Sequence, residues 1–108
     1  MRVAVLIMVT TWIPPGKATE ASKKFVEAMQ KVPFESYEKP LVPLAGRPVR
    51  DGIKAISVGE VEKGKHEEAV ERVWSRMVEF YGIEGFKFEI ETLLTAEEAM
   101  PTIGLTPP

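Results

Sequence analysis

The chain opens with a run from Arg2 to Trp12 that is β-branched, nearly uncharged, and apolar at both odd and even positions. In a β-strand, alternate side chains point to opposite faces. One face would carry Val3, Val5, Ile7 and Val9, and the other Ala4, Leu6, Met8 and Trp12. A strand that is apolar on both faces must be covered on both faces. We therefore expect this run at the centre of a sheet, between two layers of structure.

Length and charge narrow the class of protein further. The chain has 108 residues, a length at which one domain spanning residues 1–108 can hold a core of its own. The net charge is −2 with both signs interspersed, which argues against a nucleic-acid partner. There are no cysteines, so disulfides, iron–sulfur clusters and thiol catalysis are excluded, and no cofactor or metal is expected.

The apolar opening is too short to span a bilayer, and no small-residue cleavage site follows it. We therefore expect no membrane partner and a cytoplasmic location.

The chain also has no asparagine, a single glutamine and nine prolines. Few thermolabile amides and proline-stiffened loops are typical of proteins from thermophiles.

Hydrophobic spacing predicts two long helices. The first runs from Lys17 to Lys31 and ends before Pro33, because the residue preceding a proline avoids the helical region. The second runs from His66 to Tyr81, and its apolar stripe places Trp74 and Met77 in the core.

Strands are predicted from Ile53 to Glu62 and from Phe86 to Leu94. The segment 34–52 is rich in proline, so it is predicted as a loop containing an edge strand over 37–44, where proline is tolerated. Asp51-Gly52 signals a turn. Thr95 can cap a short helix over 96–100, and a tail to residue 108 follows.

The resulting order is strand, helix, strand, strand, helix, strand, which is the βαββαβ arrangement of the split βαβ unit. This predicts an α+β fold with a four-stranded antiparallel sheet, two helices on one face, and the first and third strands in the centre. Two helices cover only one face. The remaining face would carry one of the two apolar sets of the first strand beside Glu89 and Glu91, and a second copy of the chain could cover it.

The βαββαβ order, the length, and a second sheet face that mixes apolar and charged residues resemble the ferredoxin-like dimeric α/β-barrel superfamily. That group includes antibiotic-biosynthesis-type monooxygenases and families similar to muconolactone isomerase and chlorite dismutase. The resemblance covers residues 2–94 and involves no signature motif. It implies a homodimer, with a cavity between sheet and helices or inside the barrel as the place for a ligand.

Three residues are candidates for acid–base chemistry. Glu89 and Glu91 project from the same side of one strand, and burial in a dimer would raise their pKa values. The alternative is an exposed strand face or pairing with lysines across the sheet. His66 titrates near neutrality but lies at a helix start, where the dipole disfavours its charged form, so a surface role is the competing interpretation.

Ligand contacts are predicted at Trp12, Tyr37, Arg47 and Arg50, because an aromatic ring at a strand end and two arginines suit a carboxylate. Trp12 could equally be core or interface. The leading hypothesis is a small homodimer that binds an apolar or carboxylated molecule. The alternative is a cofactor-independent oxygenase or an isomerase/lyase. A ligand-sensing regulatory module is a third class, for which no fused DNA-binding domain is apparent.

Overall fold

The computed structural model describes residues 3–107, with side chains from residue 5 onward. Met1, Arg2 and Pro108, where the predicted first strand and tail begin and end, lie outside the described residues, as do the side chains of Val3 and Ala4. The elements in chain order are β1 (Val3–Ile13), α1 (Ala18–Lys31), β2 (Glu38–Val49), β3 (Gly52–Glu62), α2 (His66–Met77), a 3-10 turn (Val78–Phe80), β4 (Lys87–Leu94), α3 (Ala96–Ala99) and a second 3-10 turn (Met100–Ile103).

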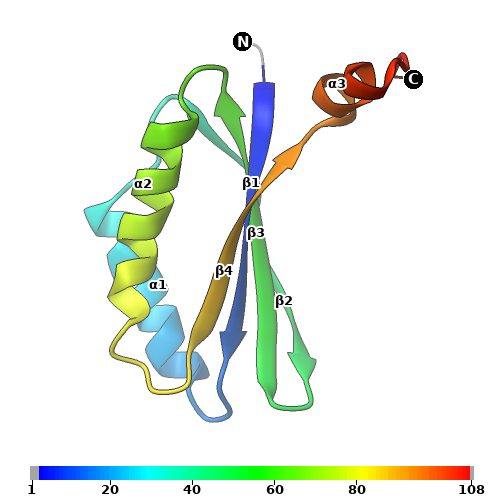
Figure 1. Cartoon of the computed structure of the whole chain (residues 1–108). Coiled ribbons are helices and arrows are strands. Elements are labelled where there is room, and N and C mark those ends of the chain that lie inside the picture. Colours follow the sequence, from blue (N-terminus) through cyan, green and yellow to red (C-terminus); the bar gives the residue numbers. More distant parts are fainter. Residues whose placement is uncertain (1–2, 108) are drawn as a thin grey trace.

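The sheet is four-stranded and antiparallel, in the order β2-β3-β1-β4. The two long helices, α1 and α2, cover the same face, while α3 lies at the far end of β4 on the opposite side (Figure 1). This is the ferredoxin-like arrangement expected from the order of elements, with β1 and β3 in the centre. We call the face without α1 and α2 the open face.

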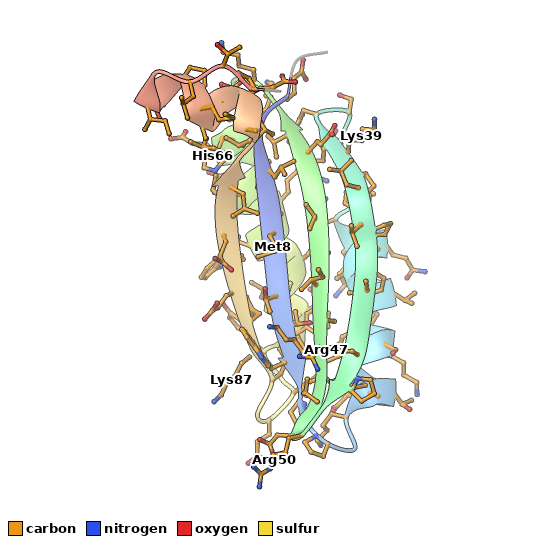
Figure 2. All side chains as sticks on the ribbon, turned by 90° about the vertical axis from the view of Figure 1, so that its right-hand side faces the viewer. Met8, Lys39, Arg47, Arg50, His66 and Lys87 are labelled. Carbon is orange, nitrogen blue, oxygen red and sulfur yellow. The ribbon has the colours of Figure 1, made fainter. Side chains whose placement is uncertain are left out.

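The odd-numbered residues of β1 face the helices. Ile7 and Val9 are buried, and they pair with helix-facing neighbours such as Ile90 on β4. The even-numbered residues lie on the open face, where Figure 2 shows Met8 at the centre. Their cross-strand neighbours are mostly charged: Lys54 and Lys87 beside Trp12, Glu89 beside Thr10, Glu91 beside Met8, and Glu60 beside Leu6. Burying these charges beneath the apolar stripes of α1 and α2 would be costly, so they decide which face the helices cover.

The core lies between the helices and the sheet. It contains two clusters, one around Val9, Met77 and Phe80 and the other around Ile7 and Val61. The helices approach through small residues that are almost fully buried: Ala21, Ala28 and Ala69. Small side chains on both surfaces allow close approach, but they also fill little volume between the layers.

The structure differs from the prediction in several places. The second helix ends at Met77 and is followed by the 3-10 turn Val78–Phe80, whereas the spacing predicts a helix to Tyr81. Trp74, predicted as core, is 52% exposed, and its ring meets that of Phe88 edge-on. Phe88 lies on the edge strand β4, so no further strand of the sheet extends beyond it to cover Trp74. The edge strand β2 extends to Val49, five residues farther than expected. It accommodates its prolines with register shifts on both sides of Val42, as edge strands allow. The last helix is only Ala96–Ala99, and Pro101 lies inside the following 3-10 turn.

Candidate functional site

A cavity of about 290 Å³ lies between the helix-covered face of the sheet, α1 and β2. Small residues on the facing surfaces, including Ala21 on α1 and Ala55 on β3, leave this space unfilled. Three exposed apolar side chains line it where it meets solvent: Val26, Phe34 and Leu44, at 53%, 44% and 51% exposure. The cavity therefore opens between α1, the α1–β2 connection and the edge strand.

The wall of the cavity is mainly apolar. Its aliphatic and aromatic part includes Ile7, Val9, Ile13, Phe25, Val73, Met77, Phe80 and Phe86. Three hydroxyl groups also line it, those of Thr11, Ser22 and Ser57, and the Thr11 Oγ1 donates to the Ala55 carbonyl oxygen at 3.4 Å. An apolar space with few polar groups holds water poorly and favours an apolar occupant.

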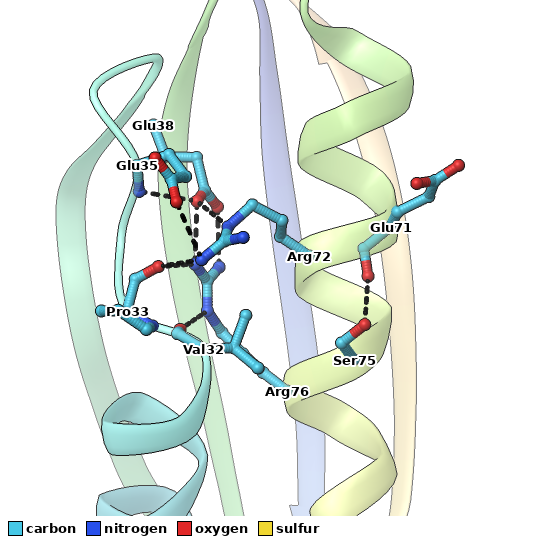
Figure 3. Close-up of polar contacts among 8 residues, drawn as sticks. All are labelled: Val32, Pro33, Glu35, Glu38, Glu71, Arg72, Ser75 and Arg76. Atoms are coloured by element: carbon cyan, nitrogen blue, oxygen red, sulfur yellow. Dashed lines mark hydrogen bonds and ion pairs between the residues drawn. The ribbon is translucent and has the colours of Figure 1, made fainter.

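One buried ion pair belongs to this wall. The guanidinium of Arg76 on α2 donates two hydrogen bonds to the carboxylate of Glu38 at the start of β2, with Nη1 2.7 Å from Oε2 and Nη2 2.8 Å from Oε1 (Figure 3). The side chains are only 9% and 7% exposed. A two-point contact of this kind fixes both position and orientation.

The same arginine also holds the connection between α1 and β2. Its Nε donates to the Val32 carbonyl oxygen at 2.7 Å and its Nη2 to that of Pro33 at 3.1 Å (Figure 3). Arg72, one turn earlier, adds contacts to Glu38 at 3.2 Å and to the Pro33 carbonyl at 2.6 Å. Arginine side chains of α2 thus tie the end of α1 and the start of β2 together beside the cavity.

Glu38 remains ionised in this setting. Burial alone would raise the pKa of its carboxyl group. The hydrogen bonds from Arg76 and from the Glu35 backbone N–H, together with the charges of Arg76 and Arg72, outweigh burial and bring the Glu38 pKa below its ordinary value. The carboxylate therefore serves as a fixed anion that binds arginine and is poorly suited to accept a proton.

Sequence reasoning missed the pair because its members are 38 positions apart and follow no motif. One signal was present. Arg76 lies three residues after Val73 and seven after Ala69, so it falls on the buried side of α2 despite its charge. A cation at such a position needs a buried anion as a partner.

The predicted acid–base residues lie away from the cavity. Glu89 and Glu91 are exposed on the open face, across from Thr10 and Met8 of β1. His66 is exposed at the start of α2, with its Nε2 2.8 Å from the Thr92 hydroxyl. Their assignment to catalysis remains a prediction.

Three of the four predicted ligand residues gather at one end of the sheet. Arg47 lies across from Lys54, Lys54 lies over the Trp12 ring at 6.0 Å, and Arg50 stands in the β2–β3 turn (Figure 2). Tyr37 is at the opposite end, against the second core cluster. The four do not form a single site.

An open groove occupies that end of the sheet, and we call it the sheet-end groove. Its aromatic lining is Trp12, Phe80, Tyr81, Phe86 and Phe88. Pro14, Pro15 and Val49 also line it, together with the charged residues Arg50, Asp51, Lys87 and Glu89. Its volume is about 980 Å³.

Two other kinds of site are absent from residues 3–107. No helix there is long and apolar enough to cross a membrane. In the same part of the chain, no three His, Asp or Glu side chains are grouped as a metal site requires.

Comparison with known proteins places the chain by its fold. No protein-family model matches it, and no curated protein matches its sequence. Similar solved structures include PA3566 from Pseudomonas aeruginosa, at 14% identity and a TM-score of 0.57 over 88% of this chain and 96% of that one. A Caulobacter crescentus protein named "putative antibiotic biosynthesis monooxygenase" is 19% identical, with a TM-score of 0.55 over 86% and 91%.

The designed protein Foldit4 is also similar, at 16% identity and a TM-score of 0.51 over 87% of this chain and 99% of that one. Because a designed protein and natural proteins share the arrangement at such low identity, these likenesses concern the fold and carry no activity across. They confirm the predicted ferredoxin-like fold.

Proposed function

We propose that this protein binds a small apolar molecule in the cavity between its sheet and helices. The observation that supports this most is the cavity itself, about 290 Å³ with a mainly apolar wall and an entrance between α1 and β2. The hydroxyls of Thr11, Ser22 and Ser57 could each bond one polar atom of the occupant. An apolar molecule is favoured over a carboxylated one because the buried cation in the wall, Arg76, is already occupied by Glu38.

The binding proposal is tested by filling the cavity. Ala21 is 3% exposed and lines the cavity, so the Ala21→Leu side chain would occupy part of the ligand volume. With benzene as the probe, we expect wild-type protein to bind it saturably, as followed by NMR shifts of the cavity methyl groups. Ala21→Leu is expected to bind it at least tenfold more weakly.

Ala18→Leu is the matched control. It makes the same change one turn earlier on α1, at an exposed position outside the cavity wall, and should leave benzene binding unchanged. Wild-type protein that gives no saturable benzene shifts would contradict the proposal. Equal binding by Ala21→Leu and Ala18→Leu would contradict it as well.

We further propose that the protein is a homodimer joined through the open face. The centre of this face carries apolar side chains among the charged ones, with Met8 of β1 beside Val58 of β3 and Ile56 two residues before Val58 on the same face. At about 25 cal/mol per Å², covering several such side chains stabilises a dimer by several kcal/mol. Two sheets packed face to face are the simplest symmetric solution.

Met8→Asp tests the dimer. Because a two-fold interface contains each residue twice, the substitution would bury two carboxylates, each beside the carboxylate of Glu91, and weaken the dimer by about 100-fold or more. Sedimentation velocity at micromolar concentration should find wild type dimeric and Met8→Asp monomeric. Thr19→Asp, on an exposed position of α1, should remain dimeric. A monomeric wild type at that concentration would refute the proposal.

A cofactor-independent oxygenase or an isomerase/lyase is the alternative function. Such an enzyme needs an acid or base beside its ligand, whereas Glu89, Glu91 and His66 all lie outside the cavity wall. Binding without turnover is therefore the function we favour.

A further inference from the structure

A line of cations crosses the open face of the sheet near one of its ends. Lys87 of β4 and Lys54 of β3 lie directly across from Trp12 of β1, and Arg47 of β2 lies directly across from Lys54. Figure 2 shows Arg47 and Lys87 on this face, toward the end that carries Arg50. Neighbouring strands are about 4.8 Å apart, so three positive charges lie on a line about 14 Å long. We call Lys87, Trp12, Lys54 and Arg47 the cationic row.

The cations of the row are not neutralised by side chains of the described chain. Like charges directly opposite on neighbouring strands destabilise a sheet, and Arg47 and Lys54 are such a pair. Among residues 5–107, the salt bridges join other side chains and include none of the three cations. Lys54 instead lies over the Trp12 ring, 6.0 Å from its centroid. An ion pair with an anion would therefore relieve a repulsion that the row now contains.

The other end of the same strands has a different arrangement of charges. There, Lys39 of β2 lies directly across from Glu60 of β3, and opposite charges in this position attract. The chain as a whole is slightly acidic, with a net charge of −2. A line of unneutralised cations is thus a local feature of the end that carries Trp12, and it suits an anion from outside the chain.

Two carboxylates lie near the row. Glu89 follows Lys87 by two residues on β4, Asp51 lies in the β2–β3 turn, and both line the sheet-end groove. Neither forms an ion pair with a cation of the row. Since the row and the groove together contain four cations and only these two carboxylates, the positive charge dominates.

The row continues into the sheet-end groove, because Trp12 and Lys87 belong to both. Beyond Trp12, the groove offers the rings of Tyr81 and Phe86 and the side chain of Pro14. An inorganic ion would leave these surfaces uncovered, whereas an aromatic ring can pack against them. Cations beside an aromatic surface therefore match a ligand that carries both an anionic group and a ring.

We propose that the cationic row and the sheet-end groove together bind a small aromatic anion, an aryl carboxylate or an aryl phosphate. Its ring lies in the groove against Trp12. Its anionic group is bound by the cations of the row, and the flexible stem of Lys54 lets the ammonium group turn from the Trp12 ring toward the anion. Arg50 adds a further cation at the groove.

This site is distinct from the apolar cavity, whose wall contains neither Trp12 nor any cation of the row. It also lies about 13 Å along β1 from Met8, the centre of the proposed dimer interface. The inference thus goes beyond both functions proposed above and rests on neither. Trp12, Arg47 and Arg50 are three of the four residues that the sequence predicts as ligand contacts.

Titration with benzoate and with phenyl phosphate tests the site, followed through the NMR signal of the Trp12 indole N–H. In a buffer of low ionic strength, we expect both probes to bind saturably at millimolar concentration. Neutral benzamide and acetate, which lack the charge and the ring respectively, should each bind at least tenfold more weakly. Added salt should weaken the binding of both anions, because it screens exposed charges. The probe that binds more tightly identifies the anionic group.

Lys54→Met removes the cation in the middle of the row and should weaken the binding of both probes at least tenfold. Because the change also relieves the repulsion with Arg47, the urea midpoint should not fall. Arg47→Met, at an exposed position, should weaken binding in the same direction. Lys39→Met is the matched control, since it removes an exposed cation from the other end of the sheet and should leave binding unchanged.

The proposal is overturned if wild-type protein binds neither probe saturably, or if Lys54→Met and Lys39→Met bind both probes equally well. Ala21→Leu, which fills the apolar cavity, should bind both probes as wild type does. A loss of probe binding in Ala21→Leu would place the anion in the cavity and overturn the separate site. Met8→Asp, expected to be monomeric, should also bind both probes, and a loss there would overturn a site formed by one chain.

Discussion

Replacing Arg76 with Met is expected to lower the free energy of unfolding by about 3–5 kcal/mol. Methionine retains much of the side-chain volume, so the loss comes from the polar contacts. Without the guanidinium, the Glu38 carboxylate stays buried without its main partner, and the Val32 carbonyl loses its bond from Arg76. Urea denaturation at pH 7 measures this loss, with the midpoint and the slope fitted together.

An exposed ion pair provides the matched comparison. Lys31 and Glu79 are 2.9 Å apart, but the lysine side chain is 62% exposed. Lys31→Met should therefore lower the free energy of unfolding far less than Arg76→Met does. The double variant Glu38→Leu/Arg76→Met removes both charges and should be more stable than Arg76→Met alone. If Arg76→Met and Lys31→Met cost the same, Arg76 is not a buried structural cation.

Acid should weaken the same contact. The Glu38 pKa is lower in the folded protein than in the unfolded chain, where it is about 4.3. The stabilisation that ionised Glu38 contributes is therefore complete above the pKa of the unfolded chain, and it is lost as the pH falls through the lower pKa of the folded protein. The difference in unfolding free energy between wild type and Glu38→Gln should be constant near pH 7 and shrink below about pH 4. A difference that does not depend on pH would contradict this account.

Replacing Gly52 with Ala is expected to lower the free energy of unfolding by about 2–3 kcal/mol. Gly52 follows the turn residues Arg50 and Asp51 with a φ of 123°, which side-chain-bearing residues rarely adopt. A Cβ atom here would also overlap the carbonyl oxygen of Ile13 on β1. Either the β2–β3 hairpin or the end of β1 would have to move.

A substitution at Gly64 distinguishes the cost of a positive φ from the cost of the steric overlap. Its φ is 88°, but a Cβ there would meet nothing within 4 Å. Gly64→Ala should therefore cost only the conformational part, about 1 kcal/mol. Equal losses for the two variants, measured by urea denaturation, would mean that the contact with Ile13 does not matter.

Much of the fold could be predicted because it follows from local patterns. The helix ending before Pro33 and the turn at Asp51-Gly52 rest on backbone chemistry that neighbouring residues impose. The prediction that Trp74 lies in the core was wrong, because helical spacing identifies the apolar stripe of a helix but not how much of that stripe the sheet covers. Whether β4 reaches far enough to cover that side of α2 depends on how the two elements pack.

The site could be predicted far less well. Sequence reasoning selected charged and aromatic residues for their chemistry, and the fold placed Tyr37 and Trp12 at opposite ends of the sheet. The cavity has no sequence signature, since it results from small residues such as Ala21 and Ala55 meeting across two layers. The catalytic assignments of Glu89, Glu91 and His66 are still open to test.

The amino-acid sequence by itself determined the order of elements and the central place of the apolar first strand. These follow from periodicity and chain connectivity, which act between near neighbours. Only the tertiary structure decided which face the helices cover, that Arg76 meets Glu38, and where space remains between the layers. Those outcomes depend on side chains far apart in the chain, whose proximity appears only once the layers have packed.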